Sequence, residues 1–152
     1  MSTRSFIARE YEPGKYRAIY CHNDGYIEHN GKLLVENYNS PEKVDEVLAL
    51  GDLSHLTDKL YPNPNAEHSF DKRQEGVTVS YARDRGENNT EAKEYTYEEL
   101  VDLLRFCDFV YLYDKDNVWM VLPYDSLDQE FIDLQQEVDL IREYYEAMEM
   151  SL

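Results

Sequence analysis

The feature that most constrains the fold is two pairs of strand-like segments, and a short turn joins the two members of each pair. The first pair is RSFIARE and KYRAIYCH, and the Pro-Gly dipeptide of EPGK between them favours a tight reversal. The second pair is DFVYLYD and NVWMVLP, which flank the dipeptide KD. Apolar residues at every second position lie on one face of a strand. The chain is therefore expected to form two β-hairpins.

Three further segments carry the pattern of short helices. In GKLLVENYN, apolar residues recur at helical spacing. In SPEKVDEVLALGD, Ser40 can act as the N-cap, Pro41 suits the first helical position and Gly51 can end the helix. In TYEELVDLLRFC, Thr96 and Glu99 have the spacing of a capping box. Helices are predicted at all three places.

The carboxy-terminal segment has the clearest helical pattern. Its apolar residues recur at alternating steps of three and four, as on one buried helix face: Phe131, Leu134, Val138, Ile141, Tyr145 and Met148. Acidic residues recur among the remaining positions, with six between residues 131 and 150. We expect a long acidic helix in which Tyr145 follows the apolar stripe and Tyr144 is more exposed.

Together these elements predict an α+β fold. We expect a single domain over residues 1–152, with a mainly antiparallel sheet of about five strands and helices packed on it. The segment GVTVSYARD supplies the fifth strand, and Tyr111 and Tyr113 are expected in the core because they alternate with Phe109. Segment 55–75 contains two prolines and little periodicity, so it is predicted to be a mobile loop.

The charge of the chain is strongly unbalanced, with 32 acidic and 15 basic residues and a net charge of -17. A field of that sign repels DNA phosphates and anionic membranes, and it attracts basic surfaces. We therefore expect no direct binding to nucleic acid or membrane, and a basic host protein that itself binds nucleic acid as the partner. The alternative is that the acidity only maintains solubility.

Features of the termini and the cysteines bear on location. The amino terminus MSTRSFIARE has arginines where a secretion signal needs an apolar core, and no apolar run approaches the roughly 20 residues of a membrane helix. Cys21 and Cys107 lie far apart, so they are expected to be reduced, buried thiols. These features predict a cytoplasmic protein.

Arg83 lies near the end of the strand-like GVTVSYARD and Arg85 follows it directly, just before an acidic run. Strand alternation would put both on the core-facing side, with Asp84 turned away and Gly86 permitting a turn. In one interpretation the guanidinium groups form internal ion pairs with carboxylates of the helix layer. In the other they form an external site for an anion such as a nucleotide.

The acidic carboxy-terminal segment is the candidate partner-binding surface. Negative charges repeated along a helix have a spacing comparable in scale with that of DNA phosphates, so a basic groove could accept the helix as a DNA mimic. A tyrosine ring beside carboxylates can also accept arginine by cation-π contact. The candidate residues are Glu130, Asp133, Glu137, Asp139, Glu143, Tyr144 and Glu146. The alternatives are a merely solvated helix face, and pairing of two helices in a homodimer.

Signatures of catalysis and of cofactor binding are missing from the sequence. The six glycines are scattered, so neither of the common phosphate-binding loops is present. A thiolate at Cys107 is disfavoured because the residue follows a helix end. The nearest set of metal ligands lacks a fourth member unless a distant histidine joins it: Cys21, His22 and His29, with His55 or His68. We expect no enzymatic activity, no cofactor and no metal.

Four segments in the first part of the chain carry a resemblance to known sequences: STRSFIA, YCHNDGY, ALGDLSHL and RDRGE. In this order and with these gaps they resemble a family of small, acidic, uncharacterised proteins encoded by bacteriophages and prophages. The resemblance spans roughly the first 90 residues and implies an origin in a mobile element, hence the cytoplasm of a bacterial host cell.

Small acidic phage proteins as a class include anti-CRISPR and anti-restriction inhibitors, some of which imitate the charge of DNA. By that analogy the expected function is an inhibitor that binds a basic, nucleic-acid-handling host protein such as a CRISPR or restriction effector. The alternatives are a small-molecule or nucleotide-binding protein that uses Arg83 and Arg85, and a structural or housekeeping phage protein.

Overall fold

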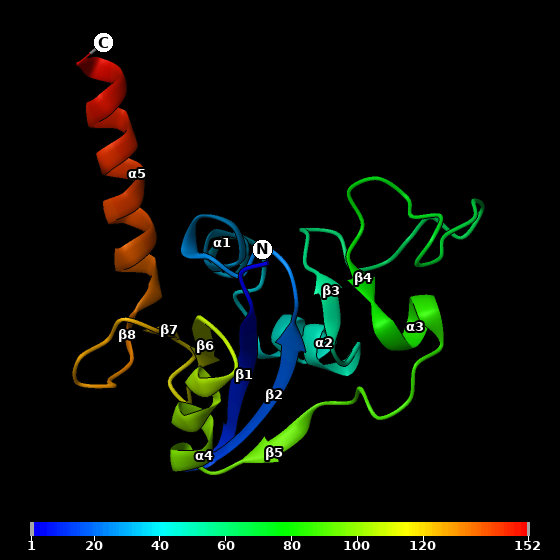
Figure 1. Cartoon of the computed structure of the whole chain (residues 1–152), viewed down its shortest axis with the longest axis horizontal. Coiled ribbons are helices and arrows are strands. Elements are labelled where there is room, and N and C mark those ends of the chain that lie inside the picture. The colour runs from blue at the N-terminus through cyan, green and yellow to red at the C-terminus, as the bar shows by residue number, and fades with distance from the viewer. Residues whose placement is uncertain (1, 152) are drawn as a thin grey trace.

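Both predicted hairpins form, and they lie side by side in one sheet of a computed structural model that describes residues 2–151 (Figure 1). In the first hairpin β1 pairs antiparallel with β2, and in the second β6 pairs antiparallel with β7. The two hairpins join through β1 and β6, which run parallel, with Ile7 opposite Tyr111. Segments about a hundred residues apart in sequence therefore form the centre of the sheet.

The sheet has eight strands in the order β4-β3-β2-β1-β6-β7-β8, and β5 also pairs with β2. Most pairings are antiparallel, as predicted, whereas the expected number of about five strands was too low. The additional strands have only two or three residues, which is too short for an alternating pattern to be visible. The strands are β1 (Ser5–Glu12), β2 (Lys15–Cys21), β3 (Leu53–His55), β4 (Val79–Ser80), β5 (Lys93–Tyr95), β6 (Phe109–Tyr113), β7 (Trp119–Pro123) and β8 (Ile132–Asp133).

Helices form at the three predicted places, with the expected caps. The Ser40 hydroxyl accepts a hydrogen bond from the Lys43 backbone NH, and Thr96 and Glu99 form a capping box. The helices and helical turns are the π-helical turn η1 (Ile27–Gly31), α1 (Lys32–Asn37), α2 (Pro41–Ala49), α3 (Tyr81–Arg85), α4 (Tyr97–Asp102), the 3₁₀ turn η2 (Leu103–Arg105) and α5 (Leu134–Met150).

The core consists of two apolar clusters, one on each face of the sheet. Alternate residues of β1 divide between them, since Ile7 lies in the larger cluster and Ala8 in the smaller. The larger cluster includes residues of α1, α2 and the start of α5, and the smaller includes residues of α4 and η2. Tyr111 and Tyr113 are buried in the larger cluster, which confirms their prediction as core residues.

The predicted strand ending at Arg85 was wrong, because only Val79 and Ser80 pair as a strand there. The chain turns into α3 at Tyr81, since the Ser80 hydroxyl accepts a hydrogen bond from the Arg83 NH and caps the helix. Gly86 ends α3 in the left-handed conformation, at φ +72°. Local capping therefore outweighs the alternating pattern that the sequence shows through this segment.

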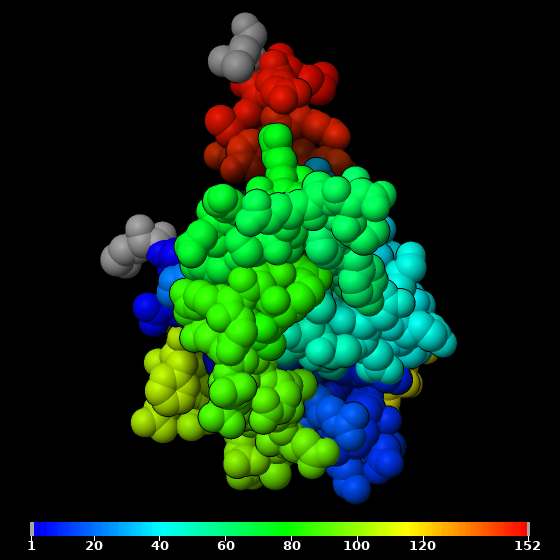
Figure 2. Space-filling view, turned by 90° about the vertical axis from the view of Figure 1, so that its right-hand side faces the viewer, coloured from blue at the N-terminus to red at the C-terminus, as the bar shows by residue number. Residues whose placement is uncertain are grey.

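Residues 56–78, which include most of the predicted mobile loop, contain neither helix nor strand. Figure 2 shows this segment covering one side of the molecule together with α3. Leu56 and Leu60 are nevertheless buried, and the Thr57 backbone NH donates to the Thr78 hydroxyl. The absence of regular structure agrees with the sequence, while the mobility of the loop stays a prediction.

Gly51 and Gly76 offer a test of how the end of α2 is packed. Both have φ +74°, but a Cβ at Gly51 would overlap the Thr90 carbonyl, whereas a Cβ at Gly76 would meet nothing within 4 Å. In urea unfolding we expect Gly76→Ala to lower the free energy of unfolding by about 1 kcal/mol, because alanine is strained in the left-handed conformation. Gly51→Ala should lower it by about 3 kcal/mol, because steric overlap with Thr90 adds to that strain. Equal losses in the two variants would contradict this packing.

Candidate functional site

The C-terminal helix α5 begins against the body of the protein. Asp133 caps it by accepting a hydrogen bond from the Gln136 NH at 2.9 Å, and Leu134 and Val138 are buried in the larger core cluster. Leu134 approaches closely at Gly31 of η1, where a Cβ would lie 3.1 Å from its Cδ1 atom. The absence of a side chain at Gly31 thus lets α5 start against η1.

Beyond its first turns α5 projects from the body, as Figure 1 shows. Every residue from 142 to 150 is exposed. Tyr145 and Met148, which continue the apolar stripe of the buried part, are 52% and 47% exposed. Tyr144 is more exposed than Tyr145, as predicted, at 62%, although Tyr145 is not buried with the rest of the stripe. The body ends before the stripe does, so the last turns carry an apolar face open to solvent.

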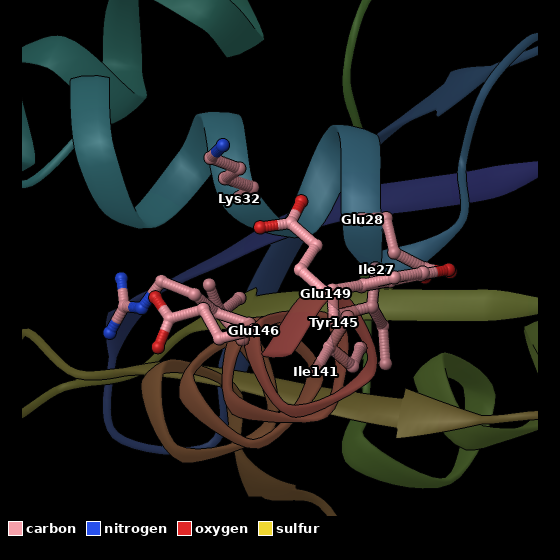
Figure 3. Close-up of a pocket in the computed structure, with 9 residues that line it drawn as sticks. Ile27, Glu28, Lys32, Ile141, Tyr145, Glu146 and Glu149 are labelled. Carbon is pink, nitrogen blue, oxygen red and sulfur yellow. The ribbon is translucent and has the colours of Figure 1, made fainter. Parts of the chain in front are cut away.

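A groove of about 290 Å³ lies between η1 and this part of α5; it is called the α5 groove below. Its apolar lining comes from Ile27 of η1 and from Val138, Ile141 and Tyr145 of α5. Figure 3 shows Ile27 next to Ile141 and Tyr145. Charged residues complete the lining: Glu28, Lys32, Arg142, Glu146 and Glu149. The site therefore combines an apolar floor with a charged margin.

Sequence reasoning missed the η1 side of this groove. Ile27 and Glu28 follow the turn-forming NDGY and belong to no periodic run. They face α5 because the chain makes a π-helical turn there and because Gly31 permits close packing. Neither property has a local sequence signal, so only the tertiary structure reveals this half of the site.

The acidic candidates do not form one surface. With about 100° of rotation per residue, Asp139, Glu143 and Glu146 lie within about 60° of one another, and these three are called the acidic face below. Glu137 lies about 120° from Glu143 around the helix axis, so it is outside the acidic face and lies beside Leu140 and Tyr144.

Two further candidates precede the helix. The expectation that helix begins near Phe131 was wrong, since α5 begins at Leu134. Glu130 lies in the preceding loop, and Asp133 is the N-cap, whose carboxylate is engaged by the helix backbone. Phe131 packs against the smaller cluster, on the other face of the sheet from α5. The three-four spacing of the sequence continued by coincidence across this boundary.

Charge on the acidic face is partly compensated. Arg142 Nη2 lies 2.6 Å from Asp139 Oδ1, and Gln135 also donates to that oxygen. Glu143 and Glu146 are exposed. These two carboxylates are therefore the ones best placed to meet a basic partner.

Arg83 uses its donors inside the protein. Its guanidinium donates to the Leu60 and Thr78 carbonyls, each at 2.6 Å, and to both carboxylate oxygens of Asp84. Asp84 was expected to turn away, but its side chain is only 2% exposed. The geometry therefore favours the internal ion pair over an external anion site at Arg83.

Arg85 is also engaged by neighbouring groups. Its guanidinium pairs with Glu87 at 2.9 Å and lies over the rings of Phe70 and Tyr81, at 4.3 and 4.9 Å from their centroids. Because α3 is a helix, Arg83 and Arg85 point in different directions and do not form a common anion site.

Asp84 fastens the long loop to α3. His68, 3% exposed, places Nε2 3.2 Å from Asp84 Oδ2, although the direction is poor for a hydrogen bond. Its Nδ1 accepts from the Gln74 NH at 3.0 Å. Burial acts to raise the pKa of Asp84, but hydrogen bonds from Arg83 and from the Ser80 NH outweigh it and hold that pKa below its ordinary value.

The other candidate groups are poorly placed for chemistry. Burial raises the pKa of the Cys21 thiol to about 11 and that of Cys107 to about 12, so both are thiols rather than nucleophilic thiolates at neutral pH. Among residues 2–151, no three His, Cys, Asp or Glu side chains converge in the manner of a metal site. No helix in the same range has the length and apolar composition needed to cross a membrane.

Comparison of the chain with protein-family models, with curated proteins and with solved structures gives no match. The resemblance to phage proteins consequently stays an expectation, and no residue has a role taken from a relative. The α5 groove and the acidic face are identified by their geometry alone.

The Asp84 cluster predicts a specific response to acid. Because the folded-state pKa of Asp84 lies below its ordinary value of 3.8, ionised Asp84 stabilises the fold above that pH, and the stabilisation is lost as pH falls through the lower folded-state pKa. At pH 7 we expect Asp84→Asn to lower the free energy of unfolding by about 3 kcal/mol, since Arg83 loses its charged partner. Urea unfolding should show this difference shrinking below about pH 4.

Asp71→Asn is the matched control, because Asp71 is an exposed aspartate of the same loop. It should change stability by less than about 0.5 kcal/mol at either pH. If Asp84→Asn lowers the free energy of unfolding by the same amount at pH 7 and below about pH 4, the ionic role of Asp84 is ruled out.

Proposed function

We propose that this protein is a non-enzymatic, phage-type inhibitor that binds a basic, nucleic-acid-handling host protein through α5. The observation that carries the proposal is the acidic face on a helix that projects from the body. Glu143 and Glu146 are exposed there, and Figure 1 shows this part of α5 projecting from the rest of the molecule. A partner can reach these carboxylates without any rearrangement of the core.

Long-range electrostatics support the same class of partner. With a net charge of -17, the protein attracts basic surfaces from a distance and repels nucleic acid. Complementary fields of this kind raise association rates and discriminate against wrong partners. A CRISPR or restriction effector has such a surface where it binds nucleic acid, so an acidic protein bound there would compete with the nucleic acid.

The spacing of the carboxylates on the acidic face indicates how closely it could imitate the phosphates of DNA. Asp139 to Glu146 covers about 10.5 Å of helix, or one carboxylate per about 5 Å, compared with one phosphate per about 3.4 Å along one DNA strand. The charge density is therefore lower than that of a single strand, and the ion pair with Arg142 lowers it further. These values favour competition for a few phosphate-binding residues over imitation of a whole duplex.

Charge reversal on the acidic face tests the proposal. We expect Glu143→Lys combined with Glu146→Lys to reduce capture of the partner from a bacterial lysate at least about tenfold, because two attractive contacts become repulsive. The captured protein should bind nucleic acid, and the wild-type chain should displace that nucleic acid. Thermal unfolding should remain near that of the wild type, since both side chains are exposed.

The matched control is Glu75→Lys combined with Glu91→Lys, two exposed positions outside α5. This variant has the same change in net charge, so it separates a local contact from the overall field. Equal capture by both double variants would exclude the acidic face as the binding surface. A captured partner whose nucleic-acid binding is unaffected would exclude the inhibitory role.

A further inference from the structure

We propose that the α5 groove receives an amphipathic helix of the partner, with apolar residues on one side and lysine or arginine beside them. This inference deepens the proposed function and rests on it. It assigns the apolar contact that positions the partner, whereas the acidic face supplies attraction.

The apolar face of α5 has the width of a face that is normally covered. Leu140, Ile141, Tyr144, Tyr145 and Met148 lie within an arc of about 140°, which is as wide as the stripe that a surface helix turns toward its core. Leu140 and Tyr144 are 54% and 62% exposed. From residue 141 to 150 the helix rises about 13.5 Å, enough for some two and a half turns of a partner helix to lie alongside.

The walls of the groove favour a helical occupant. One wall is the π-helical turn η1, with Ile27 toward the groove, and the other is α5 itself. A helix placed against both would pack apolar side chains at three-four spacing over Ile27 and Tyr145. Aromatic anchors such as Tyr145 supply much of the binding energy of interfaces of this kind.

Charge at the margin identifies the chemistry of that helix. Glu28, Glu146 and Glu149 border the groove, and Glu137 joins Glu28 along an adjacent groove that shares Ile141 and Tyr145 with the first. Arg142 is already paired with Asp139, so its charge is compensated. Lys32 also lines the groove, but the three carboxylates outnumber it, so the margin carries a net negative charge and fits lysine or arginine.

A second copy of this chain fits the groove less well. Its α5 has the same acidic residues beside its apolar face, so pairing two helices would bring carboxylates together at both margins. Two molecules of charge -17 also repel each other before contact. Charge complementarity thus favours a basic partner over a homodimer.

Peptide probes test this directly with the intact protein. The probe is a fluorescein-labelled helical peptide of about 18 residues, with leucines on one face and lysines on the other. One control peptide has glutamates in place of the lysines, and another has the same leucines and lysines in scrambled order. Fluorescence anisotropy should show binding of the amphipathic basic peptide, and at least about tenfold weaker binding of each control.

Variants locate the contact. Tyr145→Ser should lower the affinity for the basic peptide at least about tenfold, because it removes the central apolar anchor. Met150→Ser is the control on the same helix, since Met150 is 88% exposed and lies about 140° from Tyr145. It should leave affinity within about twofold of the wild type. Both positions are exposed, so circular dichroism should show the same folded state.

Several outcomes would overturn the inference. These are no binding of the basic peptide up to about 100 µM, equal binding of the acidic peptide, or equal weakening in Tyr145→Ser and Met150→Ser. A dimer seen in sedimentation and disrupted by Tyr145→Ser would show that a second copy occupies the groove instead.

Failure here is distinguishable from failure of the proposed function. Glu143 belongs to the acidic face and does not line the groove, whereas Tyr145 lines the groove. If Tyr145→Ser keeps full partner capture and Glu143→Lys reduces it, the groove is not the binding site and the proposal for the acidic face stands. If Tyr145→Ser loses partner capture and Glu143→Lys keeps it, the groove is retained as the binding site and the acidic face is excluded.

Discussion

The close approach at Gly31 is the contact on which the geometry of the candidate site depends. A Cβ at this position would lie 3.1 Å from Leu134 of α5, 3.2 Å from Ile27 of η1 and 3.4 Å from Tyr111 of the central strand. Three elements thus meet around one residue without a side chain. Tyr111 also donates a 2.6 Å hydrogen bond to the Gly25 carbonyl, which ties the segment before η1 to the sheet. Because α5 is anchored at its start, its remaining turns project in a defined direction.

Projection of α5 explains why charge and apolar surface occur together there. A helix no longer than the body could bury its whole apolar stripe. α5 instead continues past the body, with tyrosine and methionine on one side and carboxylates on the other. Apolar exposure of this kind without charge promotes self-association, and charge without apolar surface gives only weak attraction. The combination suits a partner that is both basic and amphipathic, as the two proposals require.

Local signals made much of the fold predictable. Some features depend only on residues close together in the sequence, and each formed as predicted: the hairpins, the Ser40 cap and the Thr96–Glu99 capping box. The shorter strands and the η1 wall of the groove depend on partners far away in sequence, so no local pattern shows them. At Ser80 two local signals compete, and capping prevails because Asp84 also accepts the Ser80 NH at 2.9 Å. The acidic candidates were identified by type, but only the helix boundary and its rotation show which of them share a face.

Hydrogen exchange of α5, with and without the amphipathic basic peptide, tests the central claim most directly. In the free protein, amides of residues 142–150 should exchange quickly, since the side chains of these turns are exposed, while those near Leu134 and Val138 should exchange slowly. Addition of the peptide should slow exchange in residues 142–150 and around Ile27. Unchanged exchange in these segments, with protection appearing at α3 or in residues 56–78 instead, would contradict the account.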